Sequence, residues 1–311
     1  MILLSSATED RLQRAQTSLN GLSVGDAFGE RFLRRSGAID KLIEARNQSD
    51  LDRIVSTFAG QWAWTDDTAM SLAIVKVLQT HGRIVEQALA ETFCKVFLSD
   101  PHRGYGHGMH LLLPELSQKN AWRILPRQLF DGRGSYGNGA AMRVAPLGAY
   151  FADDLDLVKE QAERSAIVTH GHPEAVAGTI AVAIAAALAA RDENNHNPTD
   201  YLQAILQRTP AGEVADGIRT AIGISGKANE VEAALILGSG DQISAQDTVP
   251  FTLWCAANWI DNFKTALWKT ARGFGDMDTT CAIVGGIVSL RARSIPELWL
   301  SSRETLPDID T

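Results

Sequence analysis

The sequence predicts an all-α protein, a compact orthogonal bundle of helices in one domain. Apolar residues recur every three or four positions along most of the chain, which is helical periodicity. No segment alternates apolar and polar residues as a half-buried strand does, and no Asn-Gly or Asp-Gly pair lies between β-branched runs. No linker-like composition, charge run or fixed-period repeat divides the 311 residues, so we expect a single domain over residues 1–311.

Composition and charge narrow the class of protein. A hydrophobic content of 45% is ample for a packed core, and a formal charge of −8 argues against a general nucleic-acid or anionic-membrane surface. Three isolated cysteines, Cys94, Cys255 and Cys281, form neither a disulfide framework nor a zinc spacing. Residues 1–8 lack the basic region and the long apolar stretch of a signal peptide, so we expect a cytoplasmic protein. The most apolar run, residues 175–190, is interrupted by a glycine and a threonine and predicts a buried helix.

The N-terminal segment predicts a helix with an unusual buried face. Apolar residues at spacings of three and four over residues 12–22 define that face, and its continuation brings in Asp26 and then Gly29 or Glu30. Glycine recurs every fourth residue on the same segment, at Gly21, Gly25 and Gly29. Each glycine costs up to about 1 kcal/mol relative to alanine inside a helix. The pattern therefore predicts close backbone packing or ligand approach, with partial unwinding near Gly25 as the alternative.

The remaining helices are expected from periodicity, caps and breakers. They cover residues 65–81 with Gly82 as the stop, and then residues 85–98, 155–168, 173–190, 199–206, 213–224, 231–237, 248–260, 263–270 and about 276–290. A terminal segment begins at residues 295–297. Two glycine-rich stretches, residues 100–110 and 131–139, are expected to be loops.

Two acidic clusters stand before apolar helical runs and are the most informative feature of the chain. They are Thr65-Asp66-Asp67-Thr68 and Asp276-Met277-Asp278-Thr279-Thr280. Each alone is consistent with an ordinary N-cap and acidic first turn, worth about 0.3 to 1 kcal/mol per acidic residue. The repetition favours a shared site instead, because four carboxylates with several hydroxyls form the all-oxygen ligand set of Mg²⁺, Mn²⁺ or Ca²⁺.

A glycine-rich loop and two histidines are further candidates. In Ser135-Tyr136-Gly137-Asn138-Gly139-Ala140-Ala141-Met142-Arg143 the glycines could let backbone N–H groups face a phosphate, although a plain turn explains them too. In Thr169-His170-Gly171-His172-Pro173 the histidines lack further ligands for zinc, so a pocket-lining or a structural role is expected. Trp62 and Trp64 could stack on a ring, but core packing is the simpler interpretation.

These motifs, in this order, resemble those of the ADP-ribosylglycohydrolase family, which includes the dinitrogenase reductase-activating glycohydrolase and the ADP-ribosyl-acceptor hydrolases. The motifs are Gly25-Asp26-Ala27-Phe28-Gly29, Trp64-Thr65-Asp66-Asp67-Thr68, Ser135 to Arg143, Thr169-His170 and Gly275-Asp276-Met277-Asp278-Thr279. The resemblance extends over residues 19–300 and includes Ile295-Pro296-Glu297-Leu298-Trp299.

The resemblance implies a metal-dependent hydrolase with a cleft for two Mg²⁺ or Mn²⁺ ions. It implies cleavage of the glycosidic bond that links ADP-ribose to an acceptor, which is a protein or a small molecule. By motif position the metal ligands are Thr65, Asp66, Asp67, Asp276, Asp278 and Thr279. The positions that line the ADP-ribose pocket are Ser135, Tyr136, Gly137, Asn138, Gly139 and His170.

Two positions depart from the family pattern. Met277 replaces a threonine between two aspartates and alters only a spacer. Leu33 stands where many relatives have a glutamate seven residues after the aspartate equivalent to Asp26, and Glu30 lies one turn earlier. We therefore expect Glu30 to be the general acid or base, with Asp66 and Asp276 as the alternative carboxylates, or Glu30 simply to pair with Arg34.

The sequence, with this resemblance, thus predicts a cytoplasmic de-ADP-ribosylating hydrolase, expected to be a monomer although the sequence leaves the oligomeric state open. Two alternatives stay open, a hydrolase of another nucleotide-like metabolite and a non-catalytic ADP-ribose-binding relative. Retention of all four aspartates favours an enzyme, because a cluster of buried like charges is costly unless an ion compensates it.

Overall fold

The computed structural model describes residues 6–34, 37–191, 197–292 and 294–307. In these residues the chain forms seventeen α-helices and two 3₁₀ helices, and the only strand-like pairings are two isolated bridges. The predicted all-α class is therefore confirmed. Residues 1–5, which belong to the segment examined for a signal peptide, lie outside the described part of the chain, as do residues 308–311.

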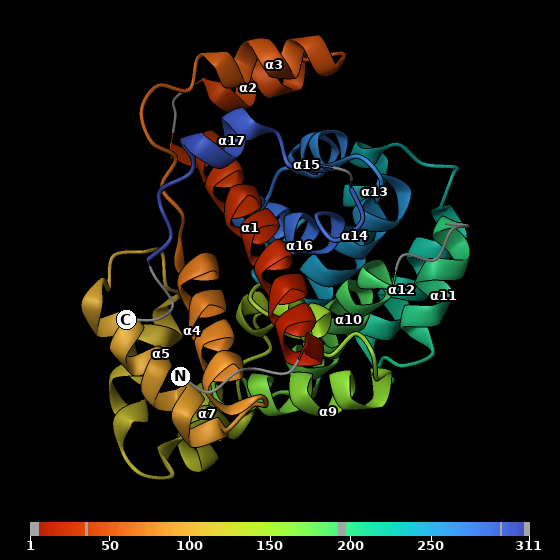
Figure 1. The fold of residues 1–311 in the computed structure, drawn as a ribbon. Coiled ribbons are helices and arrows are strands. Elements are labelled where there is room, and N and C mark those ends of the chain that lie inside the picture. The colour runs from red at the N-terminus through yellow and green to blue at the C-terminus, as the bar shows by residue number, and fades with distance from the viewer. Residues whose placement is uncertain (1–5, 35–36, 192–196, 293, 308–311) are drawn as a thin grey trace.

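The helices follow one another with short connections (Figure 1). They are α1 (Ser6–Arg34), α2 (Ala38–Glu44), α3 (Gln48–Ser56), α4 (Asp66–His81), α5 (Glu86–Ser99), α6 (His107–Leu112), η1 (Leu113–Ser117), α7 (Ala121–Gly132), η2 (Asn138–Ala140), α8 (Ala145–Tyr150), α9 (Leu155–Ala166), α10 (Pro173–Ala190), α11 (Pro198–Leu206), α12 (Glu213–Ile224), α13 (Glu230–Leu237), α14 (Ala245–Asn258), α15 (Phe263–Ala271), α16 (Met277–Val288) and α17 (Glu297–Ser302).

Helix α1 crosses the middle of the molecule and packs along α16, although the two helices are at opposite ends of the chain (Figure 1). The three glycines of α1 make this contact. An ideal Cβ placed on Gly25 would lie 2.1 Å from the carbonyl oxygen of Cys281, and one on Gly29 would lie 2.1 Å from that of Met277. Helix α1 is continuous through Gly25, so the glycines serve close packing and the alternative of unwinding was wrong.

Helix α10 lies in the core and packs against α8, α9 and α14. It is long and apolar enough to cross a membrane by length and composition, but 72% of that stretch is buried inside the protein. The prediction of a buried helix over residues 175–190 is confirmed.

The C-terminal segment is hydrogen-bonded to the residues that precede α4. The N–H of Trp62 donates to the Ser302 carbonyl at 2.7 Å, and the N–H of Glu304 donates back to the Trp62 carbonyl at 2.8 Å. Arg103 donates to both carboxylate oxygens of Glu304 at 2.6 and 2.8 Å and stacks on Trp64, with 3.7 Å from its guanidinium carbon to the ring centroid. Both tryptophans are buried. Core packing is therefore the correct interpretation of these two side chains.

Several short helices were not predicted. Helix α3 begins with a capping box between Asn47 and Asp50, a signal that the sequence does contain. Helices α2 and α6 have seven and six residues, too few turns to produce a clear apolar period. Helix α6 begins inside the expected loop 100–110. Helix α7 was not predicted either, and its backbone is non-helical at Leu129, Phe130 and Asp131, where the expected loop 131–139 begins.

Candidate functional site

The first acidic cluster forms the N-terminus of α4. Thr65 is the N-cap, and its hydroxyl group accepts the Asp67 N–H at 3.4 Å and donates to Asp67 Oδ2 at 3.0 Å. The other oxygen, Asp67 Oδ1, is buried and has no hydrogen-bond partner in the described part of the chain. The capping interpretation is thus correct for Thr65, and it leaves one carboxylate oxygen of Asp67 free.

Asp26, a residue of α1, accepts hydrogen bonds from the N-terminus of α4. Its carboxylate accepts the Thr65 N–H at 2.9 and 3.1 Å, the Thr68 N–H at 3.1 Å and the Thr68 hydroxyl at 2.5 Å. Asp26 is completely buried. Asp26 was not predicted as a site residue, although a charged residue on an otherwise apolar helical face indicates a specific role.

The second acidic cluster forms the N-terminus of α16. Asp276 stands just before the first turn and accepts a hydrogen bond from the Asn138 side-chain amide at 2.8 Å. Asp278 is in the first turn, and its Oδ1 is buried without a partner among the described residues. Thr279 follows and is buried. Asn138 therefore links the glycine-rich loop to the second cluster.

The structure brings the two clusters together with Asp26. Burial and the negative charge of Asp26 raise the pKa of Asp66 to about 8, and burial raises the pKa of Asp26 itself to about 6. Burial, with repulsion from Asp26, Asp66 and Asp276, holds the pKa of Asp67 well above its ordinary value. Burial, with Asp276 and Asp67 nearby, does the same to the pKa of Asp278. These carboxylates repel one another across one site, and the buried Arg143 offsets part of this repulsion by lowering the pKa of Asp66.

The carboxylate and hydroxyl oxygens of the two clusters are of the type that binds hard divalent cations. As the side chains stand, no group of three or more His, Cys, Asp or Glu residues in the described chain converges on one ion position. The unpartnered oxygens, Asp67 Oδ1 and Asp278 Oδ1, belong to the two different clusters. Buried carboxylate oxygens without donors are costly, and a cation coordinated by oxygen removes that cost. Thr65, Asp66, Asp67, Asp276, Asp278 and Thr279 could therefore hold such ions after side-chain rotation.

The glycine-rich loop lies beside the second cluster. The N–H of Gly137 donates to Ser135 Oγ at 3.2 Å, and the N–H of Asn138 donates to the Ile243 carbonyl at 3.3 Å. These two N–H groups therefore have partners, contrary to the expectation of a row of free donors. Gly137 has a φ of −58°, so its conformation does not require glycine. The space around it is nevertheless tight, because a Cβ there would lie 3.2 Å from Ser135 Oγ.

His170 is buried against this loop. Its Nδ1 lies 2.7 Å from the Thr169 hydroxyl oxygen, and Cβ atoms placed on Gly137 and Gly139 would lie 3.5 and 3.2 Å from its Nε2. Burial lowers the pKa of His170 to about 3, and the charge of Arg143 adds to the effect. The imidazole is therefore neutral at physiological pH. The other histidine of the motif, His172, caps α10 by accepting the Glu174 N–H at 3.2 Å, which is a structural role.

Two exposed aromatic rings stand at the loop. Tyr136 is 45% exposed and Phe130 is 52% exposed, with ring centroids 6.5 Å apart and planes inclined by 30°. Phe130 and Asp131 adopt positive φ values of 55° and 58°, which are strained for residues other than glycine. The β-branched Ile243, whose carbonyl holds Asn138, has a φ of 52°. Phe130 was not predicted as a site residue, because an aromatic residue beside a glycine-rich stretch is no signal by itself.

Glu30 lies one helical turn after Asp26 and is buried, but it forms an ion pair with Arg34. Between the two acidic residues, Gly29 approaches the second cluster so closely that an ideal Cβ would lie 2.7 Å from the Asp278 Cα. Leu33 is 45% exposed. The expected ion pair of Glu30 with Arg34 is therefore present, and it lies beside the acidic site.

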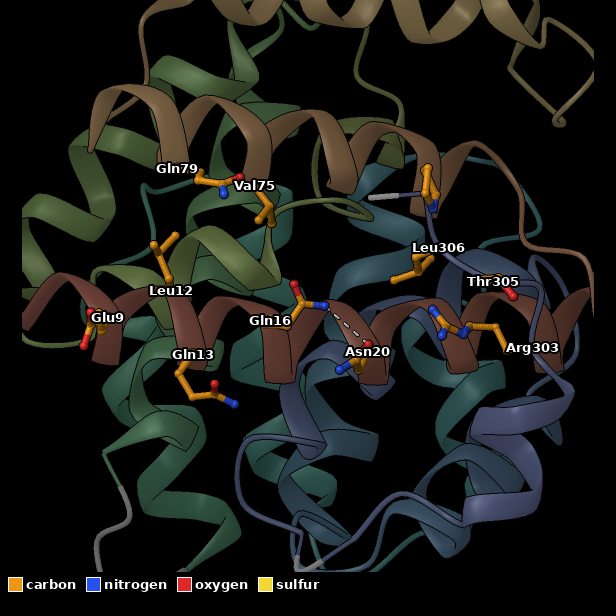
Figure 2. A pocket seen from close by; sticks show the side chains of 11 residues that line it. Glu9, Leu12, Gln13, Gln16, Asn20, Val75, Gln79, Arg303, Thr305 and Leu306 are labelled. Carbon is orange, nitrogen blue, oxygen red and sulfur yellow. Dashed lines mark hydrogen bonds between the residues drawn. The ribbon is translucent and has the colours of Figure 1, made fainter. Parts of the chain in front are cut away.

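A groove of about 530 Å³ lies elsewhere, between α1, α4 and the C-terminal segment. Figure 2 shows carboxamide side chains from α1 along its floor, with Glu9 toward one end and Arg303 toward the other. None of the predicted site residues lines it. The acidic site and the groove are therefore separate features of the surface.

Comparisons with known proteins identify relatives of the chain. The model of a family described as ADP-ribosylglycohydrolase matches residues 7–310. The chain is 30% identical to an uncharacterized protein of Archaeoglobus fulgidus over 96% of this chain and 95% of the other. It is 26% identical to the human ADP-ribosylhydrolase ARH3, over 96% and 91% of the two chains. A solved structure of an ADP-ribosylglycohydrolase-related protein complex superposes with a TM-score of 0.66 at 21% identity, over 95% and 94% of the chains.

Proposed function

The chain belongs to the ADP-ribosylglycohydrolase family, and from this premise we propose that it hydrolyses the glycosidic bond between ADP-ribose and an acceptor. The proposal includes two Mg²⁺ or Mn²⁺ ions held by the aspartates of α4 and α16. One observation supports it above the others. Asp67 and Asp278 come from helices at opposite ends of the chain, influence each other's charge, and each retains a buried oxygen without a partner.

The roles of the chain's own residues follow from their positions. Asp66, Asp67, Asp276 and Asp278, with the hydroxyls of Thr65 and Thr279, would hold the ions. When bound, such ions supply positive charge that lowers the pKa of water and orients ribose hydroxyls. Asp26 keeps the N-terminus of α4 in place, since its carboxylate accepts the Thr65 and Thr68 N–H groups.

A carboxylate must also accept the proton of the attacking water and protonate the leaving group. We propose Glu30 for this step, because it follows Asp26 by one turn on α1 and lies beside the backbone that contacts Asp278. Asp66 and Asp276 are the alternative carboxylates.

Recognition of the nucleotide is proposed for the glycine-rich loop and the exposed rings. Ser135, Asn138 and His170 offer polar groups there, with Gly137 and Gly139 leaving space for the ligand. The rings of Phe130 and Tyr136 are separated by 6.5 Å. A planar base stacks about 3.5 Å from each neighbouring ring, so a separation near twice that value suits an inserted adenine.

A non-catalytic ADP-ribose-binding protein is the second candidate function, and one observation favours it. Leu33 occupies the position at which related enzymes have a glutamate, and Glu30 is engaged with Arg34. In that case the aspartates and the loop would bind ADP-ribose without turnover.

A release assay tests the proposal. Peptides carrying ADP-ribose on serine or on arginine are incubated with the protein in Mg²⁺, Mn²⁺ or excess EDTA, and free ADP-ribose is quantified, with Asp67→Asn as the inactive control. We expect cation-dependent release from one acceptor. Binding of ADP-ribose by calorimetry without release from any acceptor would identify the binding protein, and absence of both would refute the family function for this chain.

The proposal also places the protein in the cytoplasm as a monomer. The cytoplasmic location is supported by Cys94, Cys255 and Cys281, which are all free thiols and buried. Thiols persist in reducing compartments.

A further inference from the structure

A buried arginine lies behind the glycine-rich loop. Arg143 is completely inaccessible to solvent, and it forms no ion pair with a carboxylate in the described part of the chain. Its guanidinium donates to the Ser165 carbonyl at 3.2 Å and to the Thr169 hydroxyl oxygen at 2.8 Å, and it stacks on Phe93. Burying an arginine without an ion pair is costly. Such a residue calls for an explanation beyond packing.

The hydrogen bond from Arg143 fixes the direction of the Thr169 hydroxyl. A guanidinium can only donate, so the Thr169 oxygen must accept. The single hydroxyl proton of Thr169 is then directed elsewhere, and the Nδ1 of His170 lies 2.7 Å away. Thr169 is completely buried, so no water competes for this proton. With that proton directed at Nδ1, Nδ1 accepts a hydrogen bond and the proton of the neutral imidazole resides on Nε2.

The protonated Nε2 faces the glycine-rich loop. It lies where a Cβ on Gly139 would approach to 3.2 Å, and no residue in the described chain accepts a hydrogen bond from it. Burial keeps the pKa of His170 near 3, so the ring does not gain a second proton at physiological pH. The ring is thus a neutral donor with one available N–H.

We infer that Arg143 is a positioning residue, which acts through Thr169 to hold His170 as the Nε2–H tautomer for donation to an anionic oxygen of the bound nucleotide. This deepens the proposed function and rests on it for the identity of the ligand. The hydrogen bonds from Arg143 through Thr169 to His170 also polarise the Nε2–H group, so that its partial positive charge faces the loop. The imidazole itself stays neutral, and such a donor suits a phosphate oxygen.

Nuclear magnetic resonance of ¹⁵N-histidine-labelled full-length protein tests the tautomer directly. The ring resonances of His170 are assigned by their loss in His170→Gln. We expect an unprotonated Nδ1 and a protonated Nε2 in the wild-type protein, unchanged between pH 8 and pH 5. A wild-type His170 protonated on Nδ1 would overturn the inference, whether or not the protein binds ADP-ribose.

A matched pair of variants tests the relay. Thr169→Ser keeps the hydroxyl and should keep both the tautomer and the affinity. Thr169→Val has a similar shape without the hydroxyl, and we expect it to lose the fixed tautomer and to bind ADP-ribose about tenfold more weakly, the value of one hydrogen bond. An unchanged tautomer in Thr169→Val would contradict the relay. Failure of the wild-type protein to bind ADP-ribose would refute the proposed function and leave the tautomer result standing.

Discussion

Asp26 accepts both the backbone N–H and the hydroxyl of Thr68, at 3.1 and 2.5 Å, across the contact between α1 and α4. A side chain of one helix thereby satisfies the first-turn donors of another, as an N-cap ordinarily does within its own helix. The bond fixes the first cluster relative to α1, which also contacts α16. Asp26 therefore joins the two halves of the acidic site without needing to bind an ion itself.

Replacing Asp26 should destabilise the protein more than an ordinary cap does. Asp26→Asn places an amide group against N–H donors, and we expect a loss of about 1.5 to 3 kcal/mol in the free energy of unfolding, measured in urea. Asp50→Asn is the control, because Asp50 belongs to the capping box of α3 and should cost only about 0.5 to 2 kcal/mol. Equal losses in the two variants would show that the inter-helix bonds of Asp26 have no special weight.

Loss of one carboxylate from either cluster should abolish turnover. We expect Asp67→Asn and Asp278→Asn to be inactive, with the far-ultraviolet circular dichroism of the wild-type protein, because each removes an oxygen that is otherwise unpartnered and available to an ion. Excess EDTA should reproduce both. Full activity in EDTA, or wild-type activity in both variants, would end the two-metal proposal. Asp241→Asn, at an exposed residue, is the control.

The metal-free protein should become less stable as the pH rises. The pKa of Asp26 is raised to about 6 and that of Asp66 to about 8, so the folded state retains protons that the unfolded chain releases from about pH 4 upward. Stability contributed by these protons is complete below pH 4 and declines toward pH 8. Mg²⁺ should therefore raise the melting temperature more at pH 8 than at pH 5, as calorimetry can measure. Stability that increases with pH in EDTA would contradict this assignment.

A side chain at position 139, in place of Gly139, should impair ligand binding. A Cβ there would lie 3.2 Å from the Nε2 and Cε1 of His170, so Gly139→Ala should cover the donor and weaken ADP-ribose binding at least about tenfold. Gly223→Ala on α12 is the control, since no atom lies within 4 Å of its Cβ position. Isothermal titration calorimetry compares the two. Equal dissociation constants would show that the ligand does not use this face of the imidazole.

Glu30 can be separated from its ion pair with Arg34. If Glu30 is the base, Glu30→Gln should lower kcat by about 10²- to 10⁴-fold with an unchanged melting temperature. Arg34→Ala removes the partner and should leave kcat within a few fold. The pattern expected for a purely structural pair is the reverse, with equal loss of stability in both variants and a kcat near that of the wild-type protein.

Helix positions were predictable where local signals and the core agreed. Residues 173–190 and 213–224 were predicted with the bounds that α10 and α12 have, because a proline or an acidic first turn begins a long apolar run. Gly82 ends α4 in the left-handed conformation, as its sequence position indicated. Helices of six or seven residues were missed, since so few turns carry no period.

The candidate site was predictable in its members but not in its contacts. Both acidic clusters were found because acidic residues precede apolar runs twice. The bonds from Asp26 to α4, from Asn138 to Asp276 and from Arg143 to Thr169 all join segments distant in sequence. Such partners depend on tertiary packing, which no local pattern encodes. The N–H groups of Gly137 and Asn138 were also expected to be free for a ligand, but both form hydrogen bonds within the protein.

The glycine contact between α1 and α16 has a consequence for biosynthesis. Gly21, Gly25 and Gly29 leave the ribosome before Met277, Cys281 and Gly285, which they contact, and helices α2 to α15 are synthesised in between. A helix with so distant a partner must remain incompletely packed until that partner has been synthesised. Asp278 cannot join the other aspartates until then. The nascent chain therefore does not bring all of these aspartates together until α16 has been synthesised and can pack against α1.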